Sequence, residues 1–139
     1  MKLFAASWRR LTLSVLTVLL VVSSFVIFTP SASAETFQVK LGSDKGMLAF
    51  EPKELKVKAG DTIEWVNNKV PPHNVVFDPA QNPAKSADLA KELSHKQLLM
   101  SPGQRQTTTI PADAPAGVYT FYCEPHRGAG MVGKLTVEG

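Results

Sequence analysis

Cysteine is nearly absent from this sequence, in which Cys123 is the single one among 139 residues. One cysteine excludes an internal disulfide, and it also excludes an iron–sulfur cluster, which needs several thiolates. The roles left for Cys123 are a buried apolar residue, an intermolecular link, a reactive thiol or a metal ligand. Which of these four holds decides the function.

The first 34 residues have no acidic side chain, and their pattern is that of an export signal. Residues 1–10 carry three cations, residues 11–28 are almost wholly apolar, and Ala32-Ser33-Ala34 is a small-residue cleavage pattern. We therefore expect a cleaved signal peptide at 1–34 and one domain at 35–139. A retained membrane anchor is the alternative, because an apolar run of this length reaches the lower limit of a membrane span.

The expected domain has no surplus of either charge. The signal takes three of the 15 Lys and Arg residues and none of the 12 Asp and Glu residues, which leaves 12 against 12. No basic stripe suggests nucleic acid, and no polybasic patch suggests an anionic membrane surface. The chain also lacks runs of acids, which argues against strong electrostatic steering of a partner.

Little of the remaining sequence favours helix. Short segments rich in β-branched and aromatic residues alternate with turn residues, and we expect helix only at 84–93. Seven or eight short strands in about a hundred residues predict an all-β, antiparallel sandwich. The clearest strands are expected at 37–41, 55–57, 62–67, 73–77, 106–110, 117–123 and 133–138.

One loop of the sequence carries the chemistry. Cys123, His126 and Met131 follow one another with the spacing C-x2-H-x4-M, and His73 lies fifty residues upstream after two prolines. One thiolate, two imidazoles and a thioether favour copper, in a trigonal His2Cys plane with a distant axial Met. Zinc fits less well, because structural zinc sites are closed by four strong ligands.

The remaining histidine and two other methionines have no ligand partners nearby in the sequence. We expect His95, which stands between lysines after the helical segment, to be a surface residue. Met47 and Met100 are expected to be packing residues.

These motifs resemble the plastocyanins, a cupredoxin family, in its cyanobacterial type. The resemblance covers residues 35–139 and is carried by GDT at 60–62, PPHN at 71–74, YTFYCEPH at 119–126 and GMVG at 130–133. It implies an eight-stranded Greek-key sandwich and one copper ion with the ligands His73, Cys123, His126 and Met131. It also suggests cis peptide bonds before Pro52 and Pro72.

The resemblance further implies a soluble type 1 (blue) copper electron carrier and no enzymatic activity. The implied partners are cytochrome f of the cytochrome b6-f complex and photosystem I, bound transiently by a monomer in the thylakoid lumen. The protein would be peripheral to the membrane at most.

Residues around the expected ligands would stiffen the site. Pro72 and Pro125 each fix a φ angle beside a ligand, as does Pro71. Asn74 stands where it can donate to the Cys123 sulfur or tie the two ligand loops together, and in the family it has that tying role.

A docking surface is expected around His126. Leu48, Gly128 and Ala129 would form an apolar patch with Pro71 and Pro72, the usual sign of a contact site. Tyr122 resembles the family's second, remote port for electrons. Arg127 is the one charge inside the loop, and in cyanobacterial relatives an Arg here helps docking.

Three other classes compete with this interpretation. Another cupredoxin, such as pseudoazurin, shares the ligand spacing, although Tyr122 and Arg127 favour the plastocyanins. A copper-storage protein would have exchangeable sites rich in Met or Cys. A cysteine hydrolase would use Cys123 with a histidine, but no oxyanion-hole signature accompanies it and Met131 would be idle.

Overall fold

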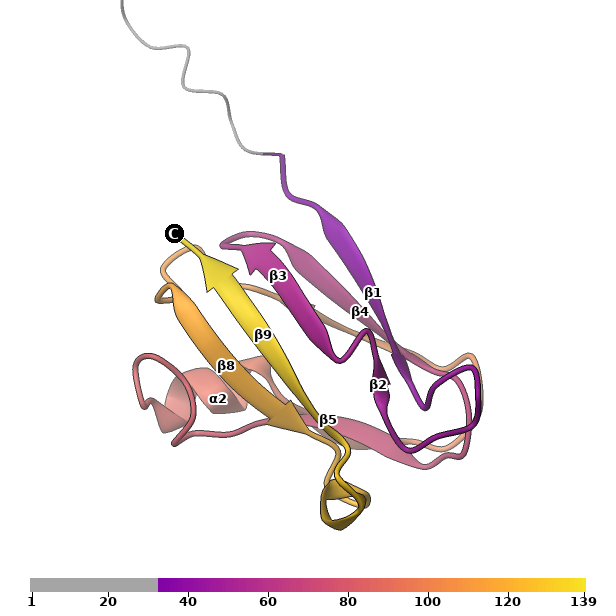
Figure 1. The fold of residues 1–139 in the computed structure, drawn as a ribbon. Coiled ribbons are helices and arrows are strands. Elements are labelled where there is room, and N and C mark those ends of the chain that lie inside the picture. The colour runs from indigo at the N-terminus through magenta and orange to yellow at the C-terminus, as the bar shows by residue number, and fades with distance from the viewer. Residues whose placement is uncertain (1–32) are drawn as a thin grey trace, which may run out of the picture. The chain divides into compact units, whose positions relative to one another are not determined.

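The structure, a computed structural model, describes residues 33–139, and they form a sandwich of two β-sheets (Figure 1). Apart from its last two residues, the expected signal peptide lies outside the described residues. The first sheet has the strand order β2-β1-β4-β7 and the second β3-β9-β8-β5-β6. The strands are β1 (Thr36–Leu41), β2 (Phe50–Glu51), β3 (Glu54–Lys58), β4 (Thr62–Asn67), β5 (His73–Phe77), β6 (His95–Leu99), β7 (Arg105–Thr109), β8 (Gly117–Tyr122) and β9 (Val132–Glu138).

The all-β sandwich is confirmed, but the sheets are not purely antiparallel. Strand β1 pairs in parallel with β4, and β3 pairs in parallel with β9. The other pairs are antiparallel. Period-two patterning cannot distinguish these cases, because side chains alternate between faces in both kinds of pairing.

Alternation along the strands builds the core between the sheets. In β4 the buried positions are Ile63, Trp65 and Asn67, and the residues between them are half-buried. Trp65 meets the ring of Phe121 edge to face, with centroids 5.1 Å apart, and Phe50 stacks on Phe121 in the same way at 4.8 Å. These aromatic contacts join the two sheets.

Strand β5 is buried along its whole length: Val75 and Phe77 lie in the core, and the helix α2 (Ala87–Leu93) packs against the strand. The helix is three residues shorter than the sequence predicted. Ser86 caps its first turn by accepting a hydrogen bond from the Leu89 N–H at 3.2 Å, and Lys85 has a φ of +47° that no α-helix accommodates.

Two strands were not predicted, and one of them changes the role expected for His95. That residue begins β6 and is half-buried, with its Nε2 atom 2.8 Å from the Thr107 carbonyl oxygen. His95 is therefore a partly exposed residue held in a strand rather than a free surface side chain. Strand β6 has three exposed residues in five, so only its pairing with β5 reveals it.

The loop between β8 and β9 projects from one end of the sandwich, opposite the C-terminus (Figure 1). It contains a single 3-10 turn, η1 (Arg127–Ala129). The peptide bonds Glu51–Pro52 and Pro71–Pro72 are cis. Among the described residues, no helix has the length and apolar character needed to cross a membrane.

Candidate metal centre

Two neighbouring strands bring the expected ligands together. Strands β5 and β8 are antiparallel, with Val76 opposite Tyr122, so the start of β5 and the end of β8 lie at the same end of the sheet. His73 is the first residue of β5, and Cys123 directly follows β8. His126 is three residues further on, just before η1.

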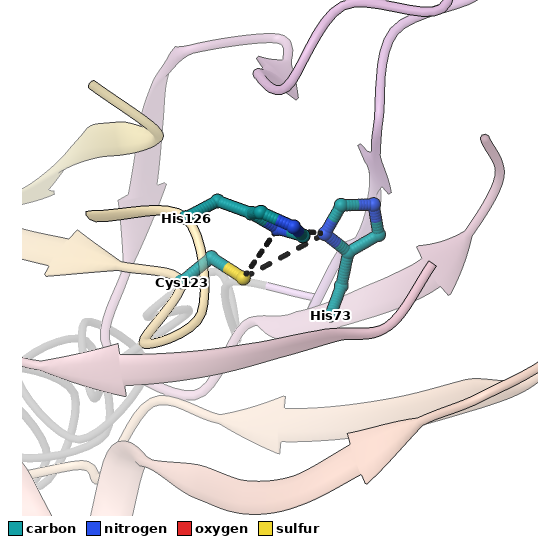
Figure 2. A group of neighbouring side chains, drawn as sticks. All are labelled: His73, Cys123 and His126. Carbon is teal, nitrogen blue, oxygen red and sulfur yellow. Dashed lines mark hydrogen bonds between the residues drawn. The ribbon is translucent and has the colours of Figure 1, made fainter. Parts of the chain in front are cut away.

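Three donor atoms from these residues face one another (Figure 2). The Nδ1 atoms of His73 and His126 are 3.2 Å apart, and the Cys123 Sγ atom lies 3.6 Å and 3.5 Å from them. A point equidistant from the corners of such a triangle is about 2.0 Å from each, the length of a metal–imidazole bond. The three atoms therefore surround a space of the size of one metal ion.

His73 is fully buried and presents its Nδ1 lone pair to this space. Its other ring nitrogen, Nε2, lies 2.7 Å from the Lys69 carbonyl oxygen, an acceptor that requires the Nε2 atom to carry the proton. Burial lowers the pKa of His73, an effect that the nearby His126 reinforces and the Lys69 carbonyl opposes. The ring is thus held neutral and ready to bind a cation.

The Cys123 thiol is completely buried and hydrogen-bonded. Burial raises its pKa, while the backbone N–H groups of Asn74 and His126 act in the opposite direction. A thiol with a raised pKa can still serve as a metal ligand, because the bound metal ion displaces the thiol proton. It does not suit a hydrolytic nucleophile, which must reach a substrate.

Met131 is also buried, and its backbone fixes it beside the other two loop residues. The Met131 N–H donates to the His126 carbonyl at 3.2 Å, and the Cys123 N–H donates to the Met131 carbonyl at 3.1 Å. Gly130, with a φ of +83°, turns the chain between η1 and Met131. The loop is therefore closed by its own backbone.

Asn74 joins the two segments that carry the ligands. Its side-chain carbonyl accepts a hydrogen bond from the Glu124 N–H at 2.8 Å, and its Nδ2 atom donates to the Glu124 carboxylate at 2.7 Å. The Nδ2 atom also donates to the Lys96 carbonyl at 3.1 Å. Sequence reasoning named Asn74 but missed Glu124 and Lys69, whose contributions rest on tertiary contacts and left no signal in the spacing.

The donor set fits copper. Two imidazole nitrogens and a thiolate in one trigonal group, beside a buried thioether residue, are the ligands of blue-copper sites. Closed structural zinc sites use four nitrogen, sulfur or carboxylate ligands, whereas this cluster has three such ligands among residues 33–139.

The residues expected to form a docking patch are exposed or half-buried. Gly128 and Ala129 are exposed in the loop, His126 and Pro72 are half-buried, and Leu48 is half-buried in the segment before β2. Met47 and Met100 are 56% and 61% exposed, so the prediction that both are packing residues is wrong.

Arg127 and Tyr122 lie against each other. The guanidinium carbon of Arg127 is 3.9 Å from the centroid of the Tyr122 ring, and its NH2 group forms an ion pair with Asp78 at 3.1 Å. Asp78, which the sequence did not single out, is buried and directly follows β5. The guanidinium is thereby held in one place at the edge of the loop.

A β-sandwich with an imidazole–imidazole–thiolate cluster at one end defines the blue copper class of proteins. Comparison with known sequences narrows the class. A model of the family "Copper binding proteins, plastocyanin/azurin family" matches residues 37–138. The plastocyanin of Nostoc punctiforme is 78% identical over the full length of both chains, and that of Prochlorothrix hollandica is 45% identical over 99% of this chain and all of its own.

Solved structures agree with this placement. The oxidised plastocyanin of the fern Dryopteris crassirhizoma is 35% identical, with a TM-score of 0.61 over 73% of this chain and 99% of the fern protein. A pseudoazurin from Sinorhizobium meliloti is 26% identical, with a TM-score of 0.55 over 76% of this chain and 75% of its own. The chain therefore belongs to the plastocyanin/azurin family of copper binding proteins, among the plastocyanins. It is a blue copper electron carrier rather than an enzyme, and its cofactor is a copper ion.

Proposed function

We propose that the chain carries single electrons from cytochrome f of the cytochrome b6-f complex to photosystem I in the thylakoid lumen. The copper ligands in this proposal are His73, Cys123, His126 and Met131. The observation that carries it is the convergence of two Nδ1 atoms and one Sγ atom within 3.6 Å of one another. Membership of the plastocyanins supports photosynthetic partners.

Copper bound at this site supplies a one-electron couple between Cu(I) and Cu(II). The chain's own contribution is to hold the ligands in one arrangement. The Lys69 carbonyl fixes the His73 ring, and the two Asn74–Glu124 hydrogen bonds fix the start of β5 against the loop after β8. Because these bonds do not depend on the metal, the ligands need to rearrange little when the charge of the site changes.

The exposure of the proposed ligands indicates where an electron can enter or leave the site. His73 and Cys123 are fully buried, whereas His126 is half-buried among small exposed residues of the loop. A partner surface can therefore approach His126 more closely than any other proposed ligand. Tyr122 is covalently attached to Cys123 and half-buried, and we assign it to a second path from the thiolate.

The apolar end of the molecule is the proposed docking surface, with Leu48, Gly128 and Ala129 around His126. Arg127 lies at its edge, about half exposed, and its remaining N–H groups can meet carboxylates of a partner. A small apolar contact suits an encounter that must end quickly, since the carrier has to leave each partner after one electron. Residues 1–34 are proposed to direct export and then to be removed.

Two measurements on the protein purified from the lumen test these assignments. Its mass should correspond to a chain that begins at Glu35. In the visible spectrum, the oxidised copper form should be intensely coloured through charge transfer from the Cys123 thiolate. Cys123→Ser should abolish the colour, while His95→Gln, which changes a histidine outside the site, should keep it. A colourless oxidised protein, or colour that persists in Cys123→Ser, would contradict the proposed ligand set.

A further inference from the structure

Gly42, the residue directly after β1, lies against the backbone of a distant loop. It is buried and has a φ of +82°. A Cβ atom at this position would lie 2.0 Å from the Lys69 carbonyl oxygen and 2.9 Å from the Lys69 carbonyl carbon. Since non-bonded carbon and oxygen atoms do not approach so closely, any other residue would displace the Lys69 peptide group.

The displaced oxygen is the one that holds His73. The Lys69 carbonyl oxygen accepts the hydrogen bond from the His73 Nε2 atom at 2.7 Å. Figure 2 shows the opposite ring nitrogen directed at Cys123 and His126, so the Nε2 bond sets both the tautomer and the direction of the metal-binding nitrogen. A shift at residue 42 is thus transmitted to the metal centre through one atom.

Hydrogen bonds hold the Lys69 peptide group against Gly42. The N–H groups of Asn68 and Lys69 both point to the Leu41 carbonyl oxygen, at 2.9 Å and 3.4 Å. The Asn68 side-chain amide donates to the Gly42 carbonyl at 2.9 Å. The loop before β5 is therefore attached to the end of β1, and the Lys69 carbonyl cannot move aside without breaking these bonds.

We propose that Gly42 is a positioning residue of the metal centre: its missing side chain lets the Lys69 carbonyl lie where it orients His73. The inference has two parts. The orientation of the His73 imidazole by the Lys69 carbonyl applies to the metal-free protein. The effect on copper binding also rests on the proposed function, in which His73 is a copper ligand.

A second glycine provides a matched control for backbone strain. Gly46 has a φ of +76°, close to that of Gly42, but a Cβ atom there would meet no atom within 4 Å. Alanine at either position pays the same cost for a positive φ. Only alanine at position 42 also displaces Lys69, so a difference between the two variants reports the contact.

The first experiment uses the metal-free protein labelled with ¹⁵N-histidine. Solvent exchange of the His73 Nε2 proton should be slow in the wild type and about tenfold faster in Gly42→Ala, as expected for the loss of one buried hydrogen bond. Gly46→Ala should exchange at the wild-type rate. The proposal is overturned if folded Gly42→Ala matches the wild type, or if Gly46→Ala shows the same increase.

A second variant covers the case in which Gly42→Ala does not fold. Asn68→Ala removes the amide that holds the loop to Gly42 and adds no atom to the contact. It should raise the same exchange rate by about threefold, in the range of a single weakened hydrogen bond. An unchanged rate in folded Asn68→Ala overturns the proposal whenever Gly42→Ala is unfolded.

Copper binding then separates this inference from the proposed function. Gly42→Ala should bind Cu(II) about 10- to 100-fold more weakly than Gly46→Ala, the usual cost of losing the group that orients a metal-bound imidazole. If the wild type binds no copper, the proposed function fails while the exchange experiment still stands. If the wild type binds copper and both variants bind it equally, the positioning role is wrong.

Discussion

His73 shows how much one residue depends on its surroundings. It is a buried imidazole with one nitrogen bonded to a backbone carbonyl and the other facing a second imidazole and a thiol. A proton on the Nδ1 atom would have to share this space with His126. Burial and that neighbour both lower the pKa of His73, so the metal-free fold favours the neutral ring.

The stability of the metal-free protein should therefore fall in mild acid. The unfolded chain takes up a proton on His73 near pH 6.5, while the folded chain resists it, so the unfolded state binds more protons below that pH. The free energy of unfolding should decrease as pH falls below about 6.5, with a slope of at most about 1.4 kcal/mol per pH unit for one proton. It should level off below the lowered folded pKa.

Urea unfolding of the metal-free protein between pH 8 and pH 5 provides the measurement. His73→Gln should flatten the curve relative to the wild type. The matched change His95→Gln, at the histidine outside the site, should leave this part of the slope in place. Identical curves for the wild type and His73→Gln would show that His73 is not the group responsible.

At the scale of elements, one buried hydroxyl joins two sheets and a helix. The Thr108 Oγ1 atom in β7 accepts from the Trp65 Nε1 atom at 2.8 Å and donates to the Leu93 carbonyl at 3.2 Å. The His95 Nε2 atom in β6 lies 3.1 Å from the same oxygen. Strands β6 and β7 are edge strands of different sheets, so this cluster closes one side of the sandwich.

Thr108→Val should destabilise the fold through an unpaired donor. Valine keeps the shape and the β-branch but leaves the buried Trp65 N–H without its acceptor, at a cost of about 1–3 kcal/mol. Thr107→Val, at the exposed neighbouring position of the same strand, should change stability by less than about 0.5 kcal/mol. Urea unfolding at neutral pH compares the two, and equal stabilities would refute the role of the hydroxyl.

At the scale of the whole molecule, the two ends of the sandwich differ in what they present. The loop between β8 and β9 carries exposed small residues around the half-buried His126, and the opposite end carries the turn before β8 and the C-terminus (Figure 1). Lys and Arg balance Asp and Glu over residues 35–139, so this segment has no net charge to attract a partner from a distance. The apolar end is the proposed docking surface for a redox partner.

A charge introduced at the apolar end should slow electron transfer. Ala129→Glu places a carboxylate beside His126, where docking would have to desolvate it, and the second-order rate constant with reduced cytochrome f should fall by about tenfold or more. Ala116→Glu makes the same change at an exposed alanine before β8, at the other end, and should change the rate by less than about twofold.

Stopped-flow kinetics at several salt concentrations measures both variants, with the visible spectrum as a check that the site is intact. An equal loss of rate in the two variants would indicate a general charge effect. It would remove the apolar end as the docking surface.

Sequence patterns predicted the strands that are rich in β-branched and aromatic residues and missed those defined by pairing alone. The segments 62–67 and 73–77 were predicted with the bounds of β4 and β5. Strand β2 has only two residues, and β6 carries mostly exposed side chains, so neither has a periodic signal. The parallel pairing of β1 with β4 also could not be predicted, because period-two patterning does not encode strand direction.

By itself the sequence determined the donor chemistry: one thiol, two imidazoles and a thioether, with three of the four inside a nine-residue loop. Local spacing carries that information because loop residues are close in space whatever the fold. Only the tertiary structure decided how His73, fifty residues away, meets them, and that its ring is oriented by a carbonyl for which Gly42 leaves room. Those contacts join backbone atoms to one another or to a side chain. Because every residue has a backbone carbonyl oxygen, residue types do not indicate which carbonyl will orient the ring.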